Sequence, residues 1–225
     1  MALEVERMPV EYERIRVTTW VSAVTRAMTT RNFEVFDEKG VRIACAVTNW
    51  AMLDLSARRM LDLHLLPAYD SMTQDFPLPA ALPCRLAPLS GGREYEHAVV
   101  YSDLDFNCHA NSVKYIQWAV DTLPLELLQQ KRFARTDINF IREARYGERL
   151  RIVAAEEALA FEIRNAEGEA VCRIAFRMEC LSVPDAVRVQ NFACRKTIIS
   201  CRKAWRVRIL LNRGNTETVI LRHNL

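Results

Sequence analysis

Hydrophobic and polar residues alternate along much of the first part of the chain. Residues 14–26 (RIRVTTWVSAVTR) alternate and are rich in Val and Thr, residues 32–36 continue the pattern, and a polar break at residues 37–40 leads into residues 41–55. Two-residue alternation with β-branched side chains is typical of strands, and a short polar break that ends in Gly is typical of the turn between them. The pattern therefore predicts an antiparallel meander.

A second alternating region follows a stretch rich in proline. Residues 67–88 contain five of the eight prolines without sustained periodicity, which favours a linker that crosses a surface. Beyond it, residues 111–123 place apolar side chains at helical spacing, and Pro124 ends this helix. Strands are predicted at residues 99–102, 135–145, 149–161 and 170–181.

These patterns divide the chain into four parts. Residues 1–66 form a strand-rich first unit, residues 67–95 a proline-rich linker, and residues 96–181 a second unit with one helix and several strands. Residues 182–225 form a basic extension whose structure the pattern does not define. A helix set apart from antiparallel strands predicts the α+β class.

The two strand-rich regions are similar to each other in sequence. Residues 33–35, 40 and 43–44 align without a gap, and at one constant offset, on residues 161–163, 168 and 171–172. A hairpin with common apolar alternation is one explanation of this match. We prefer a tandem repeat, in which each unit is a helix followed by a curved antiparallel sheet.

Composition narrows the classes of protein. The chain has 225 residues, of which 50% are apolar and 26% charged, so it can bury a core and is neither collagen-like nor broadly disordered. No apolar run approaches the roughly 20 residues of a membrane-spanning helix, so we expect no signal peptide and no stable membrane insertion. The seven cysteines contain no CxxC pair, which argues against a zinc ribbon or a secreted disulfide scaffold and favours a reducing cytoplasm.

Charge is distributed unevenly. The net charge of the chain is +3, but the basic extension alone carries nine Lys or Arg residues against two Asp or Glu. Such a tail suits nucleic acid or an anionic membrane surface. Phe192 and Trp205 are its only aromatic residues and it contains no recognised binding motif, so we expect no nucleic-acid partner.

Most of the candidate chemistry lies just before the predicted helix, where five polar residues occupy every second position: Asp103, Asp105, Asn107, His109 and Asn111. In an extended stretch this spacing sends a carboxylate, an amide and an imidazole to one face. Asp105 could fix the tautomer of His109 or orient a water, Asn107 could hold a carbonyl, and an imidazole such as that of His109 suits proton transfer near neutral pH. Asn111 suits a helix N-cap and Asp103 a turn.

The segment that carries these residues, 102–118 (SDLDFNCHANSVKYIQW), resembles the signature DLDxNQHVNNVKYI of the acyl-acyl carrier protein thioesterases of plant plastids and bacteria. Weaker matches occur in the same order at residues 19–20, 31–33, 50–59 and 140–143. The resemblance covers about residues 4–181. It implies a tandem (double) hotdog fold, in which each unit is a long helix wrapped by an antiparallel sheet.

The resemblance also implies an activity and its residues. Members of this family hydrolyse the thioester between a fatty acyl chain and acyl carrier protein, which releases free fatty acid and ends chain elongation in fatty acid biosynthesis, with no metal and no organic cofactor. The family's catalytic group falls on Asp105, Asn107 and His109, and its downstream acidic residue on Glu143. Asp105 or Glu143 would take a proton from water, or one of them would attack directly through an anhydride. The sequence does not separate these routes.

The chain departs from the family pattern in several places. Ala144 stands where the family often has Cys, so a thiol at that position is not required, and Cys108 stands where the family commonly has Gln. We interpret Cys108 as a packing residue on the opposite face of the extended segment. The opening residues resemble the segment after the first hotdog helix, so the first repeat is expected to be incomplete. The family's acyl pocket lies largely in that unit, which leaves chain-length preference unreadable.

The resemblance also implies a partner for the protein, and two alternative functions stay open. The expected partner is acyl carrier protein, which is acidic, so Arg58 and Arg59 are candidate carrier-binding residues, with residues 131–132 as weaker ones. A homodimer is an open alternative. The expected location is the bacterial cytoplasm, since no transit peptide precedes the domain. Two other functions stay open: a hotdog acyl-CoA thioesterase, and an inactive truncated relative that only binds acyl chains or carrier protein.

Overall fold

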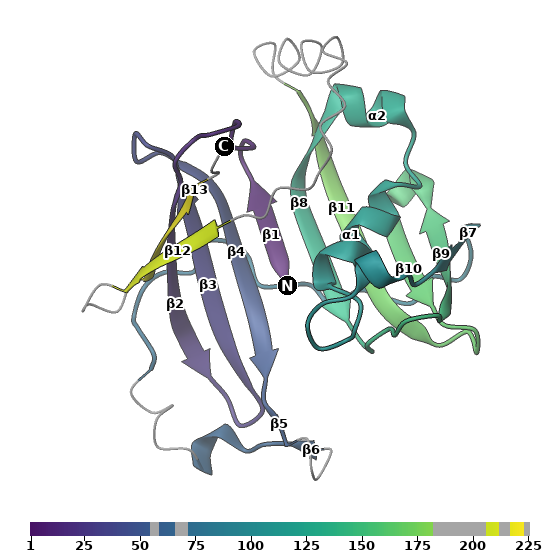
Figure 1. The fold of residues 1–225 in the computed structure, drawn as a ribbon, viewed down its shortest axis with the longest axis horizontal. Coiled ribbons are helices and arrows are strands. Elements are labelled where there is room, and N and C mark those ends of the chain that lie inside the picture. Colours follow the sequence, from purple (N-terminus) through teal and green to yellow (C-terminus); the bar gives the residue numbers. More distant parts are fainter. Residues whose placement is uncertain (55–58, 66–71, 182–205, 212–216, 223–225) are drawn as a thin grey trace. The chain divides into compact units, whose positions relative to one another are not determined.

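A computed structural model describes residues 1–54, 59–65, 72–181, 206–211 and 217–222 (Figure 1). The chain forms two compact units, one made of residues 1–83 and 198–225 and the other of residues 84–197. Each unit is built around antiparallel strands with few helices, which confirms the predicted α+β class.

The first unit contains a four-stranded antiparallel sheet in the order β2-β3-β4-β1. Its strands are β1 (Ala2–Val5), β2 (Arg16–Val24), β3 (Met28–Phe36) and β4 (Arg42–Ala51). The predicted meander is therefore confirmed. Among the described residues of this unit there is no α-helix, only the short 3-10 helix η1 (Leu63–Leu65).

Two small hairpins complete the first unit. One joins β5 (Leu53–Asp54) to β6 (Arg59–Met60). The other joins β12 (Arg206–Leu211) to β13 (Glu217–Arg222), both within the basic extension. The sequence pattern does not predict this hairpin, which is the part of the basic extension that the structure describes.

The described part of the proline-rich stretch packs across one face of the first sheet. The ring of Phe76 meets the ring of Trp20 edge to face, with centroids 5.9 Å apart. The backbone N–H of Gln74 donates to Val21 O at 2.8 Å, and the Cys45 thiol lies 3.4 Å from Pro79 O. These contacts bury the side of the sheet that carries Trp20 and Cys45.

The second unit contains a five-stranded antiparallel sheet in the order β8-β11-β10-β9-β7. Its strands are β7 (Arg93–Ala98), β8 (Lys131–Phe140), β9 (Arg149–Ala155), β10 (Ala160–Arg164) and β11 (Ala170–Cys180). Its helices are η3 (Tyr101–Asp103), α1 (Ser112–Val120), α2 (Leu125–Gln130) and η4 (Glu156–Ala158).

Helix α1 lies against one face of the second sheet, as Figure 1 shows. Its inward side chains Tyr115, Trp118 and Ala119 are buried, and the ring of Tyr115 meets the ring of Phe140 in β8 edge to face at 5.8 Å. The apolar spacing that predicts this helix matches the buried positions, and Asn111 is its N-cap, with Oδ1 accepting from the Val113 N–H at 3.0 Å. Both predictions are confirmed.

Several predicted boundaries in the second unit are wrong. Residues 99–102 do not form a strand, because the carboxylate of Asp103 accepts the N–H of Val100 and closes a 3-10 turn, while β7 lies just before it. The strand predicted at 135–145 ends at Phe140. There the N–H groups of Ile141 and Arg142 both donate to Val171 O, at 2.9 and 3.1 Å, which interrupts the ladder. Helix α2 was not predicted.

The hairpins β3–β4 and β10–β11 share the same turn. Asp37 in the first and Asn165 in the second occupy equivalent positions, and each accepts the N–H of the glycine three residues later, Gly40 at 3.1 Å and Gly168 at 3.0 Å. Both glycines have a left-handed φ, 78° and 81°. The side chains of Asp37 and Asn165 also accept a backbone N–H four residues later.

The ends of these hairpins correspond as well. A bulge follows Val35 in the first hairpin and Ile163 in the second, at the same offset as the turns. Ile43 O accepts two consecutive N–H groups from the chain after β1, as Val171 O does from the chain after β8. These shared backbone features support the tandem repeat, which we retain as a proposal.

Candidate active site

The polar segment before α1 is a closed loop and not an extended strand. Leu104 and Ala110 pair as an isolated antiparallel bridge, and the turn between them is closed by a 2.8 Å hydrogen bond from the Asp105 N–H to His109 O. Cys108 adopts a left-handed φ of 61° within it. The expectation that alternation places all the polar side chains on one face is therefore wrong, because alternation applies only to extended backbone.

The carboxylate of Asp105 holds this loop together. Its Oδ1 accepts the backbone N–H of Asn107 at 2.8 Å and that of His109 at 3.3 Å. An Asp side chain that bonds to nearby backbone N–H groups is the usual stabiliser of such a turn. Asp105 thus engages the His109 backbone, whereas the sequence suggested an interaction with the imidazole. Asn107 is exposed in the loop.

The imidazole of His109 meets Glu143 instead. His109 Nε2 lies 3.1 Å from Glu143 Oε2, and the two side chains are 26% and 67% exposed. His109 also forms an isolated antiparallel bridge with Arg145, which brings the loop alongside the chain that leaves β8. Two predicted site residues that are far apart in sequence are therefore brought into contact, with room for water beside them.

The backbone next to Glu143 is fixed by α1 and by the loop. The N–H of Ala144 donates to the hydroxyl of Tyr115 at 3.0 Å, and Ala144 O accepts the N–H of Ala110 at 2.8 Å. Ala144 is fully buried, so the position where related proteins often carry Cys faces away from solvent. Burial raises the pKa of Tyr115 to about 12, so its hydroxyl is neutral at physiological pH.

Asp103 anchors the start of the loop, in a cluster that the sequence did not predict. Its carboxylate, 5% exposed, lies 3.0 Å from His97 Nε2 in β7 and 3.4 Å from Lys114 Nζ in α1. Its backbone O accepts the N–H of Asn111 at 2.8 Å. Burial works to raise the pKa of Asp103, but hydrogen bonds from the Val100 N–H, His97 and Lys114 outweigh it and lower that pKa. These residues come from three different elements and meet only in the folded chain, so no local sequence pattern predicts the cluster.

The first turn of α1 begins directly after this loop. Backbone N–H groups at a helix N-terminus lack intrahelical partners, and the helix dipole adds a partial positive charge there. Three of these groups are engaged: the Asn111 N–H donates to Asp103 O, the Val113 N–H to Asn111 Oδ1 and the Lys114 N–H to Asn111 O. The Ser112 N–H and the helix dipole are left to stabilise negative charge that develops near the loop.

The structure gives less support to the predictions for Cys108 and for the candidate carrier-binding arginines. Cys108 is exposed, so the interpretation as a packing residue is wrong. Arg59 is exposed in β6, and Arg58 lies outside the described residues. Arg132 is paired with Glu179, their charged groups 2.5 Å apart.

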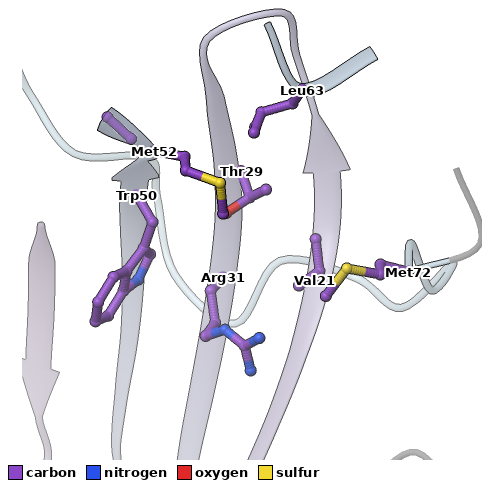
Figure 2. A pocket seen from close by; sticks show the side chains of 8 residues that line it. Val21, Thr29, Arg31, Trp50, Met52, Leu63 and Met72 are labelled. Carbon is purple, nitrogen blue, oxygen red and sulfur yellow. The ribbon is translucent and has the colours of Figure 1, made fainter. Parts of the chain in front are cut away.

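The first unit contains an open cavity of about 330 Å³. It lies over β2, β3 and β4, and Figure 2 shows Met52, Leu63 and Met72 closing over it from the chain segments that follow the sheet. Its other lining residues are Val21, Thr29, Arg31, Trp50 and Ala51. Most of this lining is apolar, so the cavity suits an apolar group.

The described residues form neither a metal site nor a membrane-spanning helix. Within the described ranges, no group of three or more His, Cys, Asp or Glu residues is arranged to hold a metal ion. The same part of the chain has no helix with the length and apolar character needed to span a membrane.

A helix lying on a curved antiparallel sheet, with a polar loop at the start of that helix, defines a hotdog-type protein. Residues 1–64 match the model of the acyl-ACP thioesterase N-terminal domain, and residues 88–182 match that of the C-terminal domain. The chain belongs to the acyl-ACP thioesterase family, which confirms the resemblance seen in the sequence.

Solved structures agree with this assignment. The crystal structure of an acyl-ACP thioesterase from Bacteroides thetaiotaomicron is 35% identical, with a TM-score of 0.73 over 79% of this chain and 74% of that one. The 12:0-ACP thioesterase from Umbellularia californica is 19% identical, with a TM-score of 0.70 over 80% and 73% of the two chains, and shows the shared fold alone.

Curated relatives come from plants. A chloroplastic acyl-[acyl-carrier-protein] hydrolase of Cuphea viscosissima is 26% identical over 164 residues, which cover 69% of this chain and 39% of the relative. A chloroplastic palmitoyl-acyl carrier protein thioesterase of Gossypium hirsutum is 29% identical over 155 residues, covering 64% and 37%. The matched part of the chain thus spans less than two fifths of the length of each of these two relatives.

Proposed function

We propose that this protein hydrolyses the thioester of fatty acyl-acyl carrier protein, releasing free fatty acid and so ending chain elongation. The observation that carries the proposal is the His109–Glu143 pair, 3.1 Å apart, in the loop that leads into α1. Family membership supports the substrate class, since the Bacteroides and plant relatives are named as acyl-ACP thioesterases or hydrolases.

The proposed chemistry is attack by water on the thioester carbonyl. Glu143 orients His109, and the pair takes a proton from water as its oxygen bonds to the carbonyl carbon. The Ser112 N–H and the helix dipole at the start of α1, with Asn107, stabilise the oxyanion. The C–S bond then breaks, and the proton passes to the departing thiolate. Asp105, whose Oδ1 is engaged with backbone N–H groups, keeps the loop in shape.

We also propose that the cavity of the first unit receives the acyl chain. Its lining is supplied largely by Val21, Leu63, Met52 and Met72, which suit a hydrocarbon. The exposed side chain of Arg59 belongs to the same unit and suits an acidic carrier protein. Substitution of Leu63 by Trp is expected to shift the preferred acyl chain to a shorter length.

The test is hydrolysis of a panel of acyl-acyl carrier protein substrates by purified protein. We expect release of fatty acid by the wild type and a loss of at least about a hundredfold in His109→Ala, as for removal of a general catalyst. His64→Ala, a histidine in η1 of the first unit, is the matched control and is expected to keep full activity.

Two results would overturn the proposal. A folded wild-type protein that releases no fatty acid would favour an inactive relative that only binds acyl chains or carrier protein. Faster turnover of acyl-CoA than of the matching acyl-acyl carrier protein would favour the hotdog acyl-CoA thioesterase, because the same carbonyl chemistry serves either carrier.

A further inference from the structure

The hydroxyl of Tyr115 lies inside the second unit, next to the site but out of reach of a substrate. Tyr115 is 3% exposed, and its ring packs edge to face against Trp118 and Phe140, with centroids 5.0 and 5.8 Å apart. Its oxygen accepts the backbone N–H of Ala144 at 3.0 Å. A residue in the middle of α1 is therefore bonded to the chain immediately after Glu143.

Together with other hydrogen bonds, this one fixes the backbone on both sides of Glu143. On one side, Ala144 is held by Tyr115 and by Ala110, whose N–H donates to Ala144 O at 2.8 Å. On the other side, the Arg142 N–H donates to Val171 O at 3.1 Å. Ala110 directly follows His109 and Ala144 directly follows Glu143. The hydrogen bond between Ala110 and Ala144 therefore connects the backbones that carry both members of the catalytic pair.

The side chain of Glu143 needs this support because it is held by little else. It is 67% exposed, so packing does not select its rotamer, and its contact with His109 depends on where the backbone places it. A displacement of about 1 Å in a reacting group can cost up to roughly a hundredfold in rate. The position of Ala144 therefore bears directly on the geometry of the pair.

We propose that Tyr115 is a positioning residue for the reaction, and that its hydroxyl fixes Ala144 and so keeps the Glu143 carboxylate against the imidazole of His109. This inference rests on the proposed function. The competing explanation is that the hydroxyl only satisfies a buried N–H group, which would affect stability and leave the chemical step unchanged.

The first test compares Tyr115→Phe with Tyr95→Phe. Tyr95 is a matched control, because its hydroxyl also makes hydrogen bonds within the second unit, donating to Glu156 Oε1 at 2.9 Å, yet touches nothing in the site. We expect Tyr115→Phe to lower kcat by about tenfold with a change in KM of less than about twofold. Tyr95→Phe is expected to leave both constants unchanged.

The second test is a double-mutant cycle with Glu143→Gln. If Tyr115 acts through Glu143, adding Tyr115→Phe to Glu143→Gln lowers kcat no further. A full additional tenfold loss in the double variant would overturn the inference, as would an unchanged kcat in Tyr115→Phe alone. Neither of these results would affect hydrolysis by the wild type, so neither would contradict the proposed function.

A third test does not depend on activity. Crystal structures of the wild type, Tyr115→Phe and Tyr95→Phe are expected to show His109 Nε2 and Glu143 Oε2 within hydrogen-bond distance in the first and third, and separated in the second. An intact contact in Tyr115→Phe would overturn the inference even if the wild type hydrolyses nothing. Should Tyr115→Phe fail to fold, 3-fluorotyrosine at position 115 weakens the acceptor while keeping the ring and hydroxyl, and a smaller kcat loss is expected.

Discussion

His109 and Glu143 are in contact through Nε2 and Oε2, 3.1 Å apart, although one belongs to the loop before α1 and the other to the chain after β8. The isolated bridge between His109 and Arg145 brings these segments side by side. A carboxylate next to an imidazole orients the ring and stabilises its protonated form, which is what a general base in water attack requires.

Glu143→Gln should therefore lower kcat by about a hundredfold or more, because Gln keeps the size of the side chain and removes its charge. Glu157→Gln, an exposed glutamate in η4, is the control and should keep wild-type activity. Steady-state kinetics on one acyl-acyl carrier protein measures both. A Glu143→Gln enzyme with wild-type kcat would show that Glu143 plays no part in the chemical step.

Much of the fold was predictable from the sequence, for a physical reason. In β2 and β3, side chains point alternately to the two faces of the sheet and β-branched residues are frequent, and in α1 the buried residues Tyr115, Trp118 and Ala119 follow helical spacing. These signals are local, so they can be read without the rest of the chain. The positions of β2, β3 and β4 follow from them, whereas β1 was not predicted.

The site was less predictable, because its geometry comes from contacts that local pattern does not encode. The sequence predicts which residues lie in the loop but not the shape of the loop. The carboxylate of Asp105 accepts backbone N–H groups and so bends the chain, which the alternating pattern does not indicate. Glu143 was identified only through the family resemblance. His97 and Lys114 meet Asp103 through the folding of three separate elements, and nothing in their own neighbourhoods marks them.

Asp103→Asn should make stability depend less on pH. The pKa of Asp103 is lowered in the folded state: burial works to raise it, but the hydrogen bonds from Val100, His97 and Lys114 prevail. A carboxylate with a lowered folded-state pKa contributes stability that is present above its unfolded pKa of about 4 and is lost as pH falls through the folded value.

We expect Asp103→Asn to lower the free energy of unfolding by about 2 kcal/mol at pH 7, since hydrogen bonds to a charged group are lost. The gap from the wild type should narrow below about pH 4. Urea unfolding at several pH values measures it, with Asp75→Asn, an exposed aspartate, as the control. A gap that stays constant down to pH 2 would show that the charge of Asp103 contributes nothing.

Asn32→Val should stabilise the first unit. Asn32 is fully buried in β3, and neither its Oδ1 nor its Nδ2 has a hydrogen-bond partner among the described residues. A buried amide without a partner costs free energy, and Val suits a strand. We expect a gain of about 1 kcal/mol in the free energy of unfolding.

The control for this change is Asn49→Val in β4, an exposed strand position that receives a hydrogen bond from Thr30 at 3.2 Å. It should change stability by no more than about 0.5 kcal/mol. Thermal unfolding followed by circular dichroism compares the two variants. A lower melting temperature for Asn32→Val would mean that the amide has a partner in solution, such as a bound water.

Cys108 should be reactive but dispensable. It is exposed in the loop between Asn107 and His109, whereas Cys172 is fully buried and burial raises its pKa to about 12. The thiolate is the reactive form, so iodoacetamide at pH 8 should label Cys108 rapidly and spare Cys172 until the protein unfolds. Peptide mapping by mass spectrometry reads out both sites. Because the proposed attack uses water, Cys108→Ser should keep kcat within about twofold of the wild type, and loss of hydrolysis in this variant would instead make the thiol the nucleophile.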